Sequence, residues 1–105
     1  MKGDVLKGHL ELLVLTALRA GPGHGYRIIR EIADRSGGEF ELPEGTIYPA
    51  LHRLEKAGFV TSSWSEVGGR KRRVYKLSRR GRSALAEQES DWHRFERAMN
   101  LVLET

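Results

Sequence analysis

The sequence predicts a mainly α-helical fold with a small β-hairpin (class α+β): a winged helix-turn-helix followed by a long C-terminal helix. Three short segments before residue 58 carry apolar residues at helical spacing. Two runs rich in β-branched and aromatic residues then flank the pair Gly68-Gly69, and one further helical stripe reaches about Leu103. With 105 residues, of which 39% are hydrophobic, the chain is expected to form one compact domain.

The first helix is expected between Leu6 and Leu18. Apolar residues recur there every three or four positions, and Leu12 and Leu15 widen the stripe until little of the helix can face water. Gly21-Pro22-Gly23 ends this helix. A helix that is apolar on nearly every side needs more cover than the core of so small a chain provides, so the pattern predicts contact with a second subunit.

The second helix is amphipathic, begins near Tyr26 and ends at Ser36-Gly37-Gly38. After a loop at residues 39–45, a third helix is predicted from four apolar residues that share one face: Ile47, Ala50, Leu51 and Leu54. Thr46 is expected to cap its start, which places Pro49 in the first turn, where the missing N–H costs no hydrogen bond. Gly58 ends the third helix.

A β-hairpin is expected next, with strands at residues 59–64 and 72–77. Ser78 then caps a last helix with an apolar stripe in alternating steps of three and four, which is typical of a helix that pairs with another helix. The expected division is a winged helix-turn-helix part at residues 1–78 and a C-terminal dimerisation helix at residues 79–105.

The net charge of +4 is distributed unevenly along the chain. Residues 1–58 hold eight basic and eight acidic side chains, and residues 84–105 carry a net charge of −3. Residues 59–83 hold eight basic side chains against Glu66 alone, a net charge of +7. The basic residues of this segment are Arg70, Lys71, Arg72, Arg73, Lys76, Arg79, Arg80 and Arg82. Such a local excess predicts an anion-binding surface on the hairpin.

A basic hairpin beside an exposed helix favours duplex DNA as the partner, because a helix fits the major groove and phosphates attract a basic wing. The helix is expected to read the sequence and the wing to position the protein. Two other interpretations remain: the basic run is ordinary solvated surface, or the winged helix is a protein-interaction module that binds an acidic partner.

The sequence resembles the PadR family of bacterial and archaeal transcriptional regulators. The resemblance rests on His24-Gly25-Tyr26, on residues 45–58, and on Gly69-Arg70 and residues 75–81 across the wing. It implies a homodimer that binds an inverted-repeat operator, usually to repress, and that a small molecule or a change in the cell releases. A single C-terminal helix is similar to the short subfamily. Val74, where the family often has an aromatic residue, and the basic start of the last helix depart from the pattern.

The residues expected to contact DNA are Tyr26, Thr46, Tyr48, Pro49, His52, Arg53, Lys56, Arg70, Lys71 and Arg72. Four of them also have a structural interpretation: Tyr48 as packing against the wing, Arg53 as a partner of Glu55 or Glu31, Thr46 as a cap alone, and Tyr26 as core. The residues expected at the dimer interface are Leu10, Leu13, Val14, Leu85, Trp92, Phe95, Met99 and Val102.

The resemblance also implies a site for a small effector, since some single-helix members hold flat aromatic compounds between paired tryptophans. Asp91, Trp92 and Phe95 would form it here, with stacking as the source of affinity and a carboxylate that favours cations. The other interpretation of Trp92 is a core residue of the helix pair.

Other classes of protein find no support in the sequence. The chain has no cysteine, its four histidines lack the spacing of zinc ligands, and no nucleophile lies beside a base, so neither an enzyme nor a metal or other cofactor is expected. Residues 1–5 lack the features of a signal peptide, and the apolar stretch at residues 10–18 is too short to span a bilayer. A cytoplasmic protein with no membrane partner is therefore expected.

Overall fold

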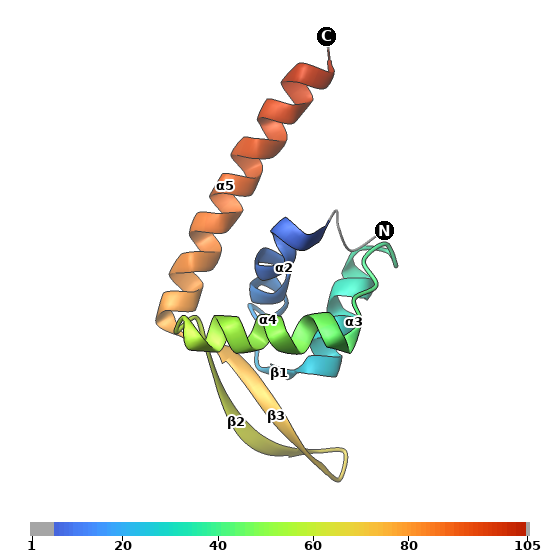
Figure 1. Ribbon diagram of the computed structural model, residues 1–105, viewed down its shortest axis with the longest axis vertical. Helices are drawn as coiled ribbons and strands as arrows, with labels where there is room; N and C mark the ends of the chain where they lie inside the picture. The colour runs from blue at the N-terminus through green and yellow to red at the C-terminus, as the bar shows by residue number, and fades with distance from the viewer. Residues whose placement is uncertain (1–5, 105) are drawn as a thin grey trace.

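The computed structural model describes residues 6–104, so the expectation about a signal peptide at residues 1–5 lies outside the described residues. The elements in chain order are the 3₁₀ turn η1 (Lys7–His9), α2 (Leu10–Ala17), β1 (Gly23–His24), α3 (Gly25–Arg35), α4 (Glu44–Lys56), β2 (Val60–Val67), β3 (Arg70–Leu77) and α5 (Arg79–Leu103). The fold is mainly helical with a small antiparallel sheet, as predicted. The molecule is elongated, about 55 Å along its longest axis, because α5 projects away from the other elements as an arm (Figure 1).

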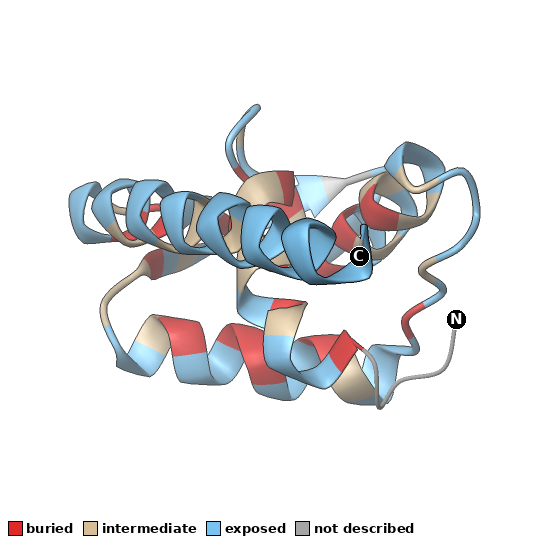
Figure 2. Cartoon of the chain, turned by 90° about the horizontal axis from the view of Figure 1, so that it is seen from above, coloured by how far each residue is buried: buried red, intermediate tan, exposed pale blue. Residues whose placement is uncertain are grey.

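The core lies where α2, α3 and α4 meet the inner ends of the strands. The apolar face of α4 is buried as its spacing predicts, with Ile47, Ala50, Leu51 and Leu54 almost inaccessible. Leu85 is the last core residue contributed by α5, and beyond Trp92 every described residue of that helix is exposed (Figure 2). The chain therefore buries the near end of α5 and leaves the far end uncovered.

The sheet has three antiparallel strands in the order β1-β3-β2. The predicted hairpin is confirmed, and both strands run further toward the turn than their composition indicates. Gly68 and Gly69 have φ angles of +59° and +78°, the left-handed conformation that a two-residue hairpin turn requires. Strand β1 was not predicted, because Gly23 and His24 follow a turn and only their pairing with Tyr75 and Val74 defines them as a strand.

The first and third helices differ from their predictions at the N-terminal end. The first helix opens with the 3₁₀ turn η1, and the regular α-helix starts only at Leu10. Thr46 was expected to cap the third helix, and this is wrong: α4 starts earlier, with Pro43 as N-cap and Glu44 in the first turn. A carboxylate near a helix N-terminus is favourable, which supports the earlier start. Thr46 therefore lies within the helix, half-buried. The expected place of Pro49 in the first turn is wrong for the same reason: Pro49 is inside α4, past the first turn, where its missing N–H removes a helical hydrogen bond.

The start of α5 agrees with the prediction. The Ser78 hydroxyl accepts a hydrogen bond from the Gly81 N–H at 3.0 Å and donates one to the Gly58 carbonyl oxygen at 2.6 Å. A Cβ on Gly81 would overlap the Phe59 carbonyl oxygen, so a glycine lets α5 lie directly against the strand entry. The arm is thus fixed to the wing at its first turn. No helix within residues 6–104 is long and apolar enough to cross a membrane.

Candidate nucleic-acid interface

Helix α4 presents a polar outer face opposite its buried stripe. Tyr48, Pro49, His52, Arg53 and Lys56 are all exposed, as predicted for a helix that reads a ligand with this side. Of the residues expected on this helix, only Thr46 is partly covered. A single helix turned outward with an aromatic ring, an imidazole and two cations has the donors and acceptors that base edges in a major groove require.

Tyr48 packs against the start of α3. An ideal Cβ built on Gly25 would lie 2.6 Å from Tyr48 Cε1 and 2.8 Å from its hydroxyl oxygen, so the ring occupies the space that any larger residue would need. The ring is nevertheless 38% exposed. Gly25 of the His24-Gly25-Tyr26 motif therefore leaves the space that the Tyr48 ring occupies. Burial raises the pKa of Tyr75 in β3, and Tyr48 is among the groups that raise it further, so the alternative of packing against the wing stays a prediction.

Arg53 has neither of the ion-pair partners that the sequence suggested. Glu55 lies 3.9 Å from Arg73, and Glu31 lies 3.7 Å from Arg35. The Arg53 side chain instead borders a groove of about 460 Å³ beside η1, with Leu10 and Pro49 among its walls. The Arg53 side chain is thus exposed on the outer face of α4.

Two aromatic rings stack at the N-terminal end of α3. The rings of His24 and Tyr26 are nearly parallel, with centroids 6.5 Å apart, and the Arg30 guanidinium lies 6.0 Å from the Tyr26 centroid. Tyr26 is 47% exposed, so its predicted alternative as a core residue is wrong. Its ring is available at the surface next to α4.

His24 caps α3 through its side chain. Nδ1 accepts a hydrogen bond from the Arg27 N–H at 3.3 Å, which requires an unprotonated nitrogen. Burial lowers the pKa of His24, and the charges of Arg72 and Arg27 lower it further. His24 pairs with Val74 of β3, which places the inner part of the wing beside the start of α3. The wing, α3 and α4 therefore adjoin one another.

The wing carries its cations at and near the turn. Arg70 and Lys71 are exposed, whereas Arg72 and Arg73 are half-buried against neighbouring side chains. Strand β3 presents no acidic residue between Arg70 and Leu77. The two outer cations match the predicted anion-binding surface, and the inner two contribute to the packing of the hairpin.

A set of contacts between α4 and the wing was not predicted. The Ser62 hydroxyl donates a hydrogen bond to Glu55 of α4, and Arg73 lies between the Glu55 carboxylate and the Trp64 ring. These contacts join α4, β2 and β3, so no spacing within one strand could have indicated them. They fix the wing against the flank of α4.

Comparisons with known proteins decide the family. The model of the transcriptional regulator PadR-like family matches residues 14–87. The chain belongs to the PadR-like family of transcriptional regulators. The match covers α3, α4, the wing and the first part of α5, which are the elements described above.

Individual relatives agree with this assignment. This PadR-like chain is 44% identical over 64 residues to the transcriptional regulator Rv3488 of Mycobacterium tuberculosis, covering 61% of this chain and 57% of that protein. Its fold is similar to a crystal structure of a PadR family regulator from Eggerthella lenta, with a TM-score of 0.84, 32% identity and coverage of 97% and 88%. It is also similar to Bacillus subtilis PadR in complex with operator DNA, with a TM-score of 0.68 and 27% identity. That match covers 76% of this chain and 46% of the other.

The residues predicted at the dimer interface of this PadR-like chain fall into two groups. Leu10, Val14 and Leu85 lie in the core of the chain itself, where Val14 is wholly inaccessible, so their spacing is explained by packing within one chain rather than by a second. The others lie at or near the surface. Leu13 and Trp92 are half-buried, and Phe95, Met99 and Val102 are exposed.

The three residues predicted for an effector site line a hollow between α5 and the start of α2. Trp92 meets His9 edge to face, with centroids 5.3 Å apart, and lies 5.8 Å from the Phe95 ring. The hollow has a volume of about 320 Å³, and Glu11 and Asp91 are among the residues that line it. The Asp91 carboxylate accepts a hydrogen bond from Arg94 at 3.3 Å. His9 was not predicted here, because it belongs to a different helix.

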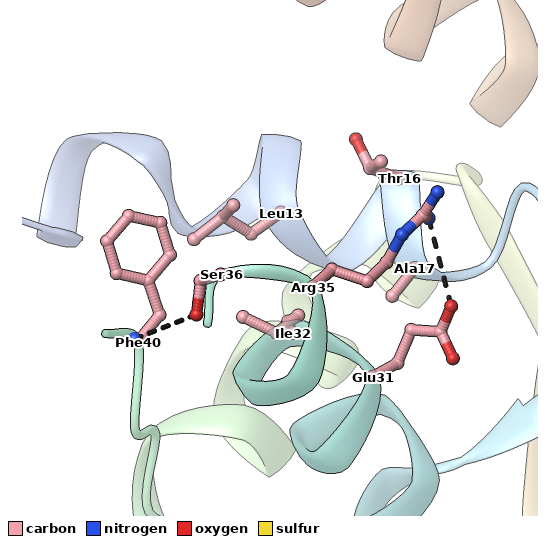
Figure 3. Close-up of a pocket in the computed structure, with 8 residues that line it drawn as sticks. All are labelled: Leu13, Thr16, Ala17, Glu31, Ile32, Arg35, Ser36 and Phe40. Carbon is pink, nitrogen blue, oxygen red and sulfur yellow. Dashed lines mark hydrogen bonds and ion pairs between the residues drawn. The ribbon is translucent and has the colours of Figure 1, made fainter. Parts of the chain in front are cut away.

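A second, smaller cavity of about 200 Å³ lies between α2 and α3 (Figure 3). Leu13, Ala17, Ile32 and Phe40 form its apolar walls. Its polar wall groups already have partners: the Thr16 hydroxyl donates to Leu12, Ser36 bonds to Ala33 and Phe40, and Arg35 pairs with Glu31. This cavity therefore offers shape but no free polar group that would orient a ligand.

Proposed function

We propose that this chain is a homodimeric, sequence-specific regulator that binds double-stranded DNA at an inverted-repeat operator and represses transcription. The observation that carries the proposal is the outward polar face of α4 beside residues 59–83, the hairpin and the first turn of α5, which together have a net charge of +7. The family of transcriptional regulators supports it, as does the fold shared with a PadR that is in complex with operator DNA. A regulator that binds chromosomal DNA in this way acts in the cytoplasm.

Two parts of the surface divide the work of binding. Tyr48, His52 and Arg53 of α4 contact base edges and supply the sequence preference, with Thr46, Pro49 and Lys56 beside them. Arg70, Lys71 and Arg72 of the wing contact phosphates, and Tyr26 adds a contact from the start of α3. Residues 1–78 thus form the DNA-binding part.

Helix α5 (Arg79–Leu103) is the dimerisation helix of the part at residues 79–105. Phe95, Met99 and Val102 follow one another at steps of four and three on the part of α5 that projects from the core, and Leu101 and Leu103 are exposed beside them. Contiguous exposed apolar surface of this kind marks an interaction site. The segment 84–105 carries −3, so pairing through it keeps the acidic arm away from DNA.

The hollow at Trp92 supports release by a small effector. Asp91, Trp92 and Phe95 combine two aromatic rings with a carboxylate, so the ligand class that fits is a flat aromatic compound, with cationic members favoured. Because the hollow lies on the arm that pairs, a ligand there acts on the geometry of the dimer.

Selection of bound sequences from a random pool of duplexes tests the proposal. The expected product is an inverted repeat with half-sites about one helical turn apart, roughly 34–36 Å, because two α4 helices of a symmetric dimer enter successive major grooves. Affinity is also expected to fall steeply and linearly on a log–log plot against salt. Recovery of no repeat, together with tight binding to an acidic protein, would replace DNA binding by the protein-interaction function.

A further inference from the structure

Trp64 is an exposed indole on the basic wing. Its side chain is 65% exposed, whereas the other tryptophan of the chain, Trp92, is half-buried. Tryptophan is highly buried on average in proteins, and an indole left in water forgoes the large apolar burial that it otherwise contributes. Since the core of the chain does not cover Trp64, its exposed ring face points to a partner outside the chain.

The strand register determines which way Trp64 faces. Trp64 pairs with Arg73 and Ser62 pairs with Tyr75 across the hairpin, so these four side chains share one face of the sheet. On that face Tyr75 is buried in the core, and Ser62 donates its hydrogen bond to Glu55 of α4. Trp64 therefore lies on the side of the wing that is turned toward α4.

Arg73 ties the ring to the helix. Its guanidinium carbon lies 5.3 Å from the centroid of the Trp64 ring, and its Nη2 lies 3.9 Å from Glu55 Oε2. The carboxylate on α4 thus holds the cation, and the cation covers one part of the indole. The result is a flat apolar plate with a positive charge beside it, fixed at the flank of the helix.

We propose that Trp64 and Arg73 bind the sugar–phosphate backbone of the DNA strand that passes between α4 and the wing, an inference that rests on the DNA-binding function proposed above. Deoxyribose offers an apolar face that packs on an indole, and the phosphate beside it is complementary to the guanidinium. Charge selects this occupant, because the surrounding segment carries +7 and would repel the same segment of a second copy. Glu55 is the positioning residue of the pair.

The contact involves the backbone only, so a mixed-sequence duplex at low salt is a sufficient probe. In the Trp92→Phe background Trp64 is the sole tryptophan, and its emission is expected to change in intensity and wavelength as the duplex saturates the protein. In that background Trp64→Ala is expected to raise the dissociation constant about tenfold, for mixed-sequence and operator duplexes alike. Ser65→Ala, on the neighbouring position and the opposite face of the same strand, is the matched control and is expected to leave the constant unchanged.

Arg73 and Glu55 have their own readouts. Arg73→Gln is expected to lower the slope of log affinity against log salt by about one, as for the loss of one phosphate contact. Glu55→Gln keeps the size of the side chain but removes the charge that holds Arg73, so the Trp64 emission of the free protein is expected to shift before any DNA is added. Circular dichroism of each variant confirms that the helices are retained.

Two results would overturn the proposal and leave DNA binding intact: silent Trp64 emission while fluorescence anisotropy reports a bound duplex, or an unchanged dissociation constant in Trp64→Ala. A loss of self-association in Trp64→Ala without any loss of duplex affinity would assign the ring to a second copy instead. If the unaltered chain bound no duplex at all, the function proposed for the whole protein would fail with it, a result distinct from the first two.

Discussion

Gly25 is the position at which one methyl group tests the arrangement of α3 and α4. In Gly25→Ala the new Cβ would lie 2.6–2.8 Å from the Tyr48 ring, closer than such contacts allow, so the ring must move. The backbone of Gly25 does not have a positive φ, and alanine there would by itself stabilise the chain by about 0.4–1 kcal/mol through the unfolded state. Overpacking costs about 1–3 kcal/mol, so a net loss of up to roughly 2 kcal/mol is expected.

The expected effect on DNA is larger than the effect on folding. Tyr48 is the aromatic residue on the outer face of α4. A ring displaced from its position against Gly25 no longer places its hydroxyl on the same face as the side chains of His52 and Arg53. A shift in one specific contact costs about 1–3 kcal/mol of discrimination, so operator affinity is expected to fall roughly tenfold while affinity for random duplex changes little. Fluorescence anisotropy with both duplexes measures the difference.

A double-mutant cycle with Tyr48→Ala isolates the cause. Removal of the ring leaves room for the methyl group, so Gly25→Ala is expected to become neutral or stabilising in that background, by urea unfolding. An equal loss of stability in both backgrounds would contradict the predicted clash with Tyr48, because the methyl group would then act on something other than that ring.

Three further predictions follow from single contacts. Gly81→Ala is expected to lower the unfolding free energy by about 3 kcal/mol or more in urea, because its Cβ would overlap the Phe59 carbonyl oxygen, whereas Ser83→Ala on the exposed side of the same helix serves as the neutral control. The pKa of His24 is lowered in the folded chain, so the neutral cap stabilises the fold above the ordinary histidine pKa, and this stability is lost as the pH falls through the folded pKa. His24→Asn keeps an acceptor at the cap and removes the titrating group. The variant is therefore expected to flatten the change in unfolding free energy between neutral pH and about pH 5. Arg70→Ala is expected to weaken binding to operator and random duplex alike and to reduce the salt slope by about one, whereas Arg53→Ala is expected to weaken operator binding selectively; equal losses for both would contradict the division between helix and wing.

Local patterns in the sequence predict most of the secondary structure. Ser78 caps α5 as expected, the two-glycine turn closes the hairpin, and the apolar spacing of α4 marks its buried face. Each of these depends on residues a few positions apart, where the period of a helix or a strand and the chemistry of a cap decide the structure.

The errors arise where distant residues decide. Strand β1 exists only through pairing with β3, and two residues are too few for an alternating pattern. The error at Thr46 is local instead: the helix starts one turn earlier, where the Glu44 carboxylate is favourable in the first turn. Val14 and Leu10 have the spacing of an interface, yet their own core covers them.

The candidate site divides in the same way into features that local patterns predict and contacts that they do not. The outer face of α4 follows from its helical period, and the basic turn follows from composition. The contacts of Trp64, Arg73 and Glu55 depend on the register of β2 against β3 and on the packing of α4 beside them. The sequence of a single strand contains neither piece of information.

The central claim is that two copies, paired through α5, place two α4 helices on one inverted repeat. Titration of the chain against the full repeat and against a duplex with a single half-site, read by anisotropy and by the mass of the complex, tests it most directly. Two chains are expected on the full repeat, with an affinity for the half-site lower by orders of magnitude at the same salt. One chain bound to a single half-site with undiminished affinity would contradict it.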